Sequence, residues 1–367
     1  MKLNSNKKVT FLLPIKERRN FTLRFFKYLA KVNFPYKLLI ADGSRKKIPS
    51  KYLGILRVAK IDFSYHKFPY DYDYTLYQKK IFNSLKLIQT EYVVLFSDDD
   101  FPIIYSINKL ILFLQKSKTY VACGGYAFNF DLLKKPFNKM EVYGHPINFG
   151  KMMVAKSNDK QNNIKRLKCY LNEMENSWHY VFRTKVLLKN YKIIQKKKIS
   201  FSNVDFYDFI QDAINFMSGK IKKIDTLTIL HQYHSESAIN SRLKYEQLIT
   251  SKYFILDVTR FYKKILSFIF NKNKKMIKKI FFKSKVLFPK NVTLLNNLSE
   301  KENIFNLRDF IVNKLSKFTI ITLFYSLYLN KIMYLDNKHI DKVVHSVKNI
   351  SIKNELNNIF NFLKKVY

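Results

Sequence analysis

The stretch YVVLFSDDD, residues 92–100, says more about the fold and the chemistry of this chain than any other segment. Its five apolar residues read as a short buried strand, and three aspartates follow after a single serine. Adjacent carboxylates repel one another by roughly 1–4 kcal/mol per pair at effective dielectric constants of about 80 to 20. A divalent cation compensates for this repulsion, because Mg²⁺ and Mn²⁺ prefer carboxylate and phosphate oxygens. The alternative is a helix N-terminus, where acidic residues are favoured.

Short strands and helices alternate around this stretch. We expect strands at residues 9–13, 36–41, 57–63 and 120–123, and helices at residues 20–32, 74–89 and 104–116. Such alternation predicts an α/β fold with a mainly parallel sheet and helices on both faces. Ligands bind beyond the carboxyl ends of the strands in such sheets, and Asp42 and the three aspartates lie at such ends.

The second half of the chain changes character near residue 240. A helix at residues 205–218 and a strand at residues 220–230 are still expected, whereas strand signals fade beyond them. Phe254, Val258, Phe261, Ile265 and Phe268 recur at helical spacing. We therefore expect two parts: an α/β domain over residues 1–240 and a basic, helical region over residues 241–367.

Composition limits the class of protein. The 367 residues are 47% hydrophobic, with only 7 glycines and 8 prolines, which excludes collagen-like and disordered chains. Two cysteines, Cys123 and Cys169, cannot form a disulfide framework or a four-cysteine zinc site. The net charge is +40, yet basic residues occupy 42 of the first 240 positions and 25 of the last 127. The charge is dispersed, so we do not expect a specific nucleic-acid partner.

Targeting signals are weak. The apolar run after the basic N-terminus covers only residues 9–15, too short for a signal peptide. The longest late uncharged run, residues 318–330, is shorter than the ~20 residues that a spanning helix needs. We expect a cytoplasmic protein, with peripheral contact at the inner face of the membrane as a further hypothesis.

At this point the chain resembles the GT-A glycosyltransferases, specifically the family 2-like group, over residues 9–237. The resemblance rests on FLLP at residues 11–14, LLIADGS at residues 38–44, and EYVVLF followed by the aspartates at residues 91–100. Asn83 precedes the first of these aspartates by 15 residues, as is common in that group. Arg18 sits where the family often has Arg or Glu after its first strand.

The resemblance implies a GT-A fold, a nucleotide-sugar donor and an acceptor on a glycan or lipid-linked molecule. It implies that Asp42 binds the base, Asp98 the ribose or metal, and that Asp100 is the main metal ligand. The full set of expected donor contacts is Pro14, Arg18, Asp42, Asn83, Asp98 and Asp99. The expected ligands for Mn²⁺ or Mg²⁺ are Asp98, Asp100 and His234, with His231 as the alternative histidine. An Asx turn before Gly43 is the alternative role for Asp42.

An inverting transferase needs one base to take the proton of the attacking hydroxyl. The resemblance places that base at the start of the helix over residues 205–218, where Asp208 is our first candidate and Asp205 the second. Asp212 can share their helical face, so the spacing leaves the assignment open. A solvated helix face is the alternative for all three carboxylates.

We therefore expect a metal-dependent glycosyltransferase of cell-surface polysaccharide or lipopolysaccharide synthesis. The competing hypothesis is a protein on a degenerate GT-A scaffold that binds nucleic acid or an anionic surface. The basic run KNKKMIKK at residues 272–279 is the candidate membrane contact, and a solvated helix face is its alternative.

Overall fold

A computed structural model describes residues 8–132, 142–152, 154–173, 176–196, 200–234, 253–267, 280, 347 and 349–364. The strands are β1 (Val9–Ile15), β2 (Lys37–Asp42), β3 (Phe63–Lys67), β4 (Tyr92–Leu95), β5 (Asp100–Pro102), β6 (Tyr120–Leu132), β7 (Pro146–Met152), β8 (Val181–Arg183) and β9 (Lys220–Gln232). The helices are α1 (Arg19–Lys31), α2 (Ser50–Val58), α3 (Tyr74–Leu85), α4 (Ile104–Lys116), α5 (Asn163–Glu173), α6 (Thr184–Lys196), α7 (Asp205–Ser218), α9 (Phe254–Ser267) and α14 (Ile350–Lys364).

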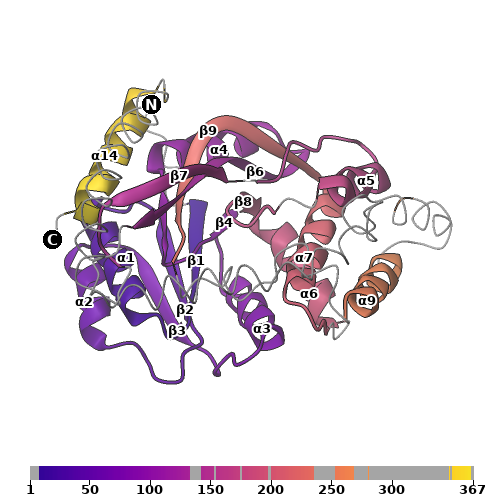
Figure 1. The fold of residues 1–367 in the computed structure, drawn as a ribbon, viewed down its shortest axis with the longest axis horizontal. Coiled ribbons are helices and arrows are strands. Elements are labelled where there is room, and N and C mark those ends of the chain that lie inside the picture. Colours follow the sequence, from indigo (N-terminus) through magenta and orange to yellow (C-terminus); the bar gives the residue numbers. More distant parts are fainter. Residues whose placement is uncertain are drawn as a thin grey trace, which may run out of the picture.

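The strands form one mixed sheet in the order β3-β2-β1-β4-β8-β6-β9-β5, and β7 pairs with β6. β1, β2, β3 and β4 are parallel, whereas β8 runs antiparallel to both β4 and β6. Figure 1 shows β9 as a long curved ribbon that crosses from the α7 side of the molecule toward α1. The expected α/β fold is confirmed, and its sheet is mixed, with β1, β2, β3 and β4 forming a parallel part.

The centre of the sheet is the core of the molecule. Every residue of β1 and β4 is buried, including those that point to opposite faces. Burial on both faces means that helices cover the sheet on both sides, as near-continuous apolar strands predict. This burial explains the apolar runs at residues 9–13 and 92–96, because polar side chains there would lose their hydrogen bonds to water.

The expected strand at residues 57–63 is wrong. α2 extends to Val58 and β3 begins only at Phe63. Tyr52, Leu53 and Leu56 form the buried face of α2 at helical spacing. The apolar residues before residue 59 thus belong to a helix, because a short apolar run alone does not distinguish a helix from a strand.

The strand register brings the carboxyl ends of the parallel strands to one edge of the sheet. Ile15 lies beside Asp42 across β1 and β2, and Asp42 lies beside Lys67 across β2 and β3. The backbone N–H of Phe96 donates to Leu12 in the neighbouring β1. The segments that follow β1, β2 and β4 consequently leave the sheet side by side.

The described C-terminal elements pack onto this body. α9 packs on α7, and its buried Asp257 accepts hydrogen bonds from the backbone N–H groups of Ser202 and Asn203, just before α7 begins. α14 packs on α4, with Leu356, Ile359 and Leu363 fully buried. In the part of the chain that the structure describes, no helix is both long enough and apolar enough to cross a bilayer.

Glu355 of α14 caps the N-terminus of α4. Its two carboxylate oxygens accept hydrogen bonds from the backbone N–H groups of Ile104 (2.6 Å) and Tyr105 (2.8 Å). Such N–H groups have no partner inside their own helix, and a negative charge is favourable there. The C-terminal helix thereby supports the helix that follows the three aspartates.

We expect Glu355→Ala to lower the free energy of unfolding by ~1 kcal/mol, because two helix N–H groups lose their acceptor. Urea unfolding of the two proteins measures the difference. Glu173→Ala, which removes an exposed partner of Lys156, is the control and should change little. Equal losses for the two variants would contradict the capping role.

Candidate functional site

The three consecutive aspartates each have their own partners. Arg18 donates from Nη2 to Asp98 and from Nη1 to Asp99, both at 2.6 Å. Thr22 donates to the second oxygen of Asp98 at 2.6 Å. Asp98, Asp99 and Asp100 are all buried, with at most 3% of their surface exposed. Protein groups therefore offset much of the repulsion among these carboxylates.

The turn between β1 and α1 directs Arg18 toward the aspartates. Glu17 has φ 58°, in the left-handed region, which is uncommon for a residue with a side chain. Its backbone N–H donates to the Ser44 hydroxyl, and its carboxylate accepts from the backbone N–H of Arg45. These bonds anchor the turn to the loop after β2, so the local strain coincides with the position of a functional side chain.

Charge and burial set the protonation of the aspartates. Burial raises the pKa of Asp98, partly offset by the Arg18 guanidinium beside it. Burial also opposes the charge of Asp99, but Arg18 and His234 outweigh it and hold the pKa of Asp99 below its usual range. The same opposition operates at Asp100, where His231 and His179 lower the pKa despite burial.

Asp100 forms a cluster with two histidines. His231 Nδ1 lies 2.6 Å from one oxygen of Asp100, and His179 Nε2 lies 3.1 Å from the other. One ligand atom from each of the three residues lies within 4.8 Å of the others, so together they could hold a metal ion. The second ring nitrogens, His179 Nδ1 and His231 Nε2, are buried without a hydrogen-bond partner among the described residues.

These residues fit a divalent transition metal. Imidazole nitrogen and carboxylate oxygen suit ions of the Mn²⁺, Fe²⁺ and Zn²⁺ type, whereas Mg²⁺ prefers oxygen ligands alone. The unpartnered ring nitrogens are the observation that supports the fit, because buried polar atoms are normally satisfied.

Strand pairing explains how the cluster forms. β5 is antiparallel to β9, and Asp100 pairs directly with His231 across the two strands. β8 is antiparallel to β4, so the segment before β8 lies at the carboxyl end of β4. That segment carries His179, which thereby reaches Asp100.

The structure does not bring Asp98 and His234 into this cluster. Both oxygens of Asp98 already accept hydrogen bonds, one from Thr22 of α1 and the other from Arg18 in the turn before that helix. His234 Nε2 lies 2.8 Å from Asp99, and the ring stacks on Phe21 at 4.1 Å between centroids. Of the expected metal ligands, Asp100 alone belongs to the cluster, and His231, the alternative histidine, joins it.

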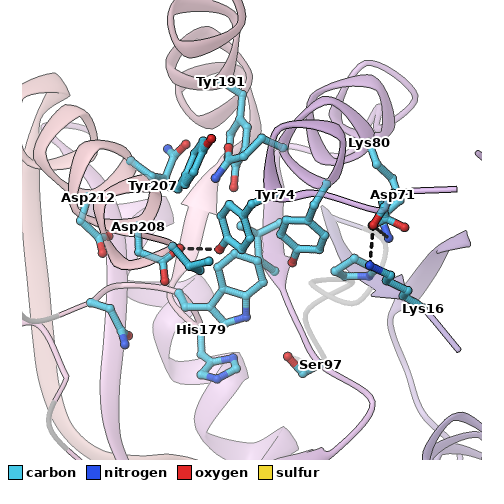
Figure 2. A pocket seen from close by; sticks show the side chains of 18 of the residues that line it. Lys16, Asp71, Tyr74, Lys80, Ser97, His179, Tyr191, Tyr207, Asp208 and Asp212 are labelled. Carbon is cyan, nitrogen blue, oxygen red and sulfur yellow. Dashed lines mark hydrogen bonds and ion pairs between the residues drawn. The ribbon is translucent and has the colours of Figure 1, made fainter. Parts of the chain in front are cut away.

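A pocket of about 740 Å³ opens beside the cluster, at the carboxyl edge of the sheet. Figure 2 shows Lys16, Asp71 and Lys80 at one end, Asp208 and Asp212 at the other, and His179 and Ser97 along one side. Its lining includes a group of aromatic side chains: Tyr72, Tyr74, Tyr77, Trp178, Tyr191 and Tyr207. The arrangement can hold a ligand that combines anionic groups with flat apolar faces.

Basic side chains surround the end of the pocket nearest β1. Lys80 forms a buried ion pair with Asp71 at 2.8 Å, and burial lowers the pKa of Lys80. Lys16 donates to the backbone carbonyl of Asp71. Pro14 and Arg18, both expected as donor contacts, line the pocket together with Asp99.

Three other expected donor contacts, Asp42, Asn83 and Asp98, lie outside the lining. Asp42 is fully buried and accepts from the Ser44 N–H (2.8 Å) and the Tyr65 hydroxyl (2.5 Å). The Ser44 bond is the Asx turn named as the alternative role for Asp42. Asn83 is half-buried near the end of α3, whereas Gln78 and Lys80 of that helix face the pocket.

The three acidic residues of α7 have different environments. Asp208 lines the pocket and accepts from the Tyr74 hydroxyl at 2.6 Å (Figure 2). Asp212 also lines it and accepts from the N–H and hydroxyl of Ser177, and burial raises its pKa to about 7. Asp205 is buried near the start of the helix and is not part of the lining.

Sequence reasoning missed three residues of the site: Asp71, Lys80 and His179. Asp71 and Lys80 carry no local motif, since their pairing depends on the packing of α3 against the end of β1. His179 had a usable signal, because it stands between Trp178 and Tyr180 just before a short apolar strand. Glu175, which lies near it in sequence, is outside the described residues.

Comparisons with known proteins give matches to solved structures only. No family model matches the sequence, and no curated protein matches it. The chain is similar to the solved structure of S. aureus TarS 1-349, at 13% identity over 77% of this chain and 73% of that one, with a TM-score of 0.47. For TarS 1-349 in complex with UDP-GlcNAc the identity is 12%, with the same coverage and a TM-score of 0.48.

We expect the stability of the protein to depend on the protonation of Asp212. Its pKa is about 7 in the folded state and about 3.9 in an unfolded chain. The folded state therefore holds the proton more tightly, and stability falls as pH rises between these values. Between pH 5 and 8 the free energy of unfolding of the wild type should fall by on the order of 2 kcal/mol more than that of Asp212→Asn. The variant keeps the shape of the side chain without its charge. Urea unfolding of both proteins at each pH tests this, and parallel profiles would refute it.

Proposed function

We propose that this protein is a metal-dependent glycosyltransferase that moves a sugar from a nucleotide-sugar donor to a hydroxyl of a glycan or lipid-linked acceptor. The observation that carries the proposal is the Asp100, His179 and His231 cluster beside a pocket that Asp208 and Asp212 also line. Sugar transfer needs the charge of the donor diphosphate neutralised at one place and a group that takes the proton of the attacking hydroxyl at another. The pocket offers both, with His179 of the cluster along one side and Asp208 at one end, in a cavity that can hold a ligand of that size.

Cationic groups support binding of the donor diphosphate. Asp100, His179 and His231 are the residues that would hold the metal, which when bound neutralises charge on the diphosphate leaving group. Lys16 and Arg18 also line the pocket and can add positive charge there. The two imidazoles make Mn²⁺ the better candidate of the two expected metals.

Asp208 is the residue we propose as the base. It lines the pocket, whereas Asp205 does not, and the Tyr74 hydroxyl holds its carboxylate in one orientation. In an inverting reaction the acceptor oxygen forms a bond to the anomeric carbon as the bond from that carbon to the diphosphate oxygen breaks. The acceptor proton passes to Asp208, and the bonding electron pair leaves with the nucleoside diphosphate.

The wider role follows as part of the same proposal. We infer synthesis of a cell-surface polysaccharide or lipopolysaccharide, with the protein in the cytoplasm and in peripheral contact with the membrane. The division at residue 240 and the membrane contact of the C-terminal region remain predictions, and the basic run at residues 272–279 lies outside the described residues.

We expect a thermal shift with one of UDP, GDP, CDP or dTDP in the presence of Mn²⁺, since a ligand at about 100 times its Kd stabilises by ~2.7 kcal/mol. His231→Ala should abolish the Mn²⁺-dependent part of the shift, because it removes one of three ligands. His66→Ala, a half-buried histidine of β3, is the matched control and should keep it. A shift of the same size without metal would contradict the metal site, and so would an Mn²⁺-dependent shift that persists in His231→Ala.

We expect Asp208→Asn to lower kcat by about 10²- to 10⁴-fold, the usual contribution of a general base, with little change in nucleotide affinity. Release of nucleoside diphosphate in the presence of saccharide acceptors measures the turnover. Asp205→Asn is the matched control on the same helix. A larger loss in the Asp205 variant would transfer the role to that residue.

A further inference from the structure

The inner part of the pocket contains buried polar atoms that lack partners. The Tyr191 hydroxyl, Gln211 Oε1 and Gln78 Oε1 have no hydrogen-bond partner among the described residues. Tyr191 is 0% exposed, and the two glutamines are 6% and 3% exposed. All three residues line the pocket, from α6, α7 and α3 respectively. An unsatisfied buried polar atom costs about 1–3 kcal/mol, so the space beside these atoms is suited to a polar occupant.

A hydrogen-bond network fixes the orientation of Gln211. Asn215 Oδ1 accepts from Asn190 Nδ2 at 2.9 Å and from Gln211 Nε2 at 3.0 Å. Ser218 donates to Asn190 Oδ1 at 2.7 Å, which sets the orientation of that amide as well. One hydrogen of the Gln211 nitrogen is committed to Asn215, and the oxygen is the atom without a partner among the described residues. That oxygen accepts hydrogen bonds and cannot donate them.

Tyr191 supplies a complementary donor. Burial raises the pKa of its hydroxyl well above the usual value, and the nearby Asp208 and Asp212 add to the effect, so the hydroxyl stays protonated. Figure 2 shows Tyr191 pointing from its helix into the space bordered by Tyr74, Tyr207 and Asp208. A ligand there meets the Tyr191 hydroxyl, in the same pocket that Gln78 and Gln211 line.

The walls of this subsite are aromatic. The rings of Tyr74 and Tyr207 lie 5.0 Å apart between centroids, and those of Tyr74 and Tyr77 lie 5.1 Å apart. Trp178 stacks on Tyr77 at 6.5 Å. Flat apolar faces suit the C–H face of a sugar ring, while the ring hydroxyls can bond to the polar atoms.

We propose that Tyr191, Gln211 and Gln78 form a subsite that binds the hydroxyl groups of an uncharged sugar ring. This inference rests on the proposed function and deepens it, by assigning the part of the pocket that selects the sugar. A sugar acid is disfavoured, because its carboxylate would face the carboxylates of Asp208 and Asp212. The ring belongs either to the donor or to the acceptor, and both present the same hydroxyl chemistry.

The donor arm of the test compares UDP with UDP-GlcNAc, and GDP with GDP-mannose, by calorimetry in the presence of Mn²⁺. Tyr191→Phe and Gln211→Leu should weaken binding of the nucleotide-sugar about tenfold, the equivalent of one hydrogen bond, and leave binding of the nucleoside diphosphate unchanged. Tyr36→Phe, at a buried tyrosine whose hydroxyl contacts Asn108 away from the pocket, is the matched control.

The acceptor arm uses saturation-transfer NMR with glucose, galactose, N-acetylglucosamine and glucuronic acid. If the ring belongs to the acceptor, one of the neutral sugars gives a signal that Tyr191→Phe removes, and glucuronic acid gives none. The melting temperature of the ligand-free Tyr191→Phe protein should equal or exceed that of the wild type, because the change removes an unpartnered hydroxyl and keeps the ring.

Three outcomes decide the matter. Weaker nucleotide-sugar binding in the donor arm, or loss of the monosaccharide signal in the acceptor arm, supports the subsite and shows whether it holds the donor sugar or the acceptor sugar. Unchanged binding in both arms overturns it and leaves these polar atoms to water. If no nucleotide binds the wild-type protein, the proposed function fails, whereas the monosaccharide signals and their loss in Tyr191→Phe still report on the subsite.

Discussion

The balance of charge around three buried carboxylates is the constraint on which the site depends. Asp98 and Asp99 share the guanidinium of Arg18, and Asp100 lies between two histidines. Leaving such carboxylates buried without cations would cost several kcal/mol for each charge. The strained turn before α1 and the pairing of β5 with β9 can be understood from this requirement, because they place the cations.

The three aspartates differ in the side chains that they contact. Both oxygens of Asp98 are used in bonds to Arg18 and Thr22, so this residue connects the motif to α1. Asp100 faces two imidazoles whose other nitrogens lack partners among the described residues, so it has the environment of a metal ligand. Three identical side chains in a row therefore have different environments, which depend on their neighbours in space.

The elements far along the chain complete this arrangement. α9 holds the segment before α7 through Asp257, and α14 caps α4 through Glu355. These contacts fix the start of the helix that carries Asp208 and the helix that follows the aspartates. Helices and strands thus carry much of the site, and loops supply only part of its lining.

The sequence by itself determined the alternation of strands and helices, the acidic motif at the end of β4 and the carboxylates of α7, because apolar periodicity is local information. Strand 57–63 failed for the same reason, since a short apolar run is ambiguous. Only the tertiary structure decided which partners meet. His231 reaches Asp100 across 131 residues through strand register, and His179 does so through the antiparallel β8. Spacing along the chain cannot reveal such contacts, because they depend on which strands become neighbours in the folded sheet.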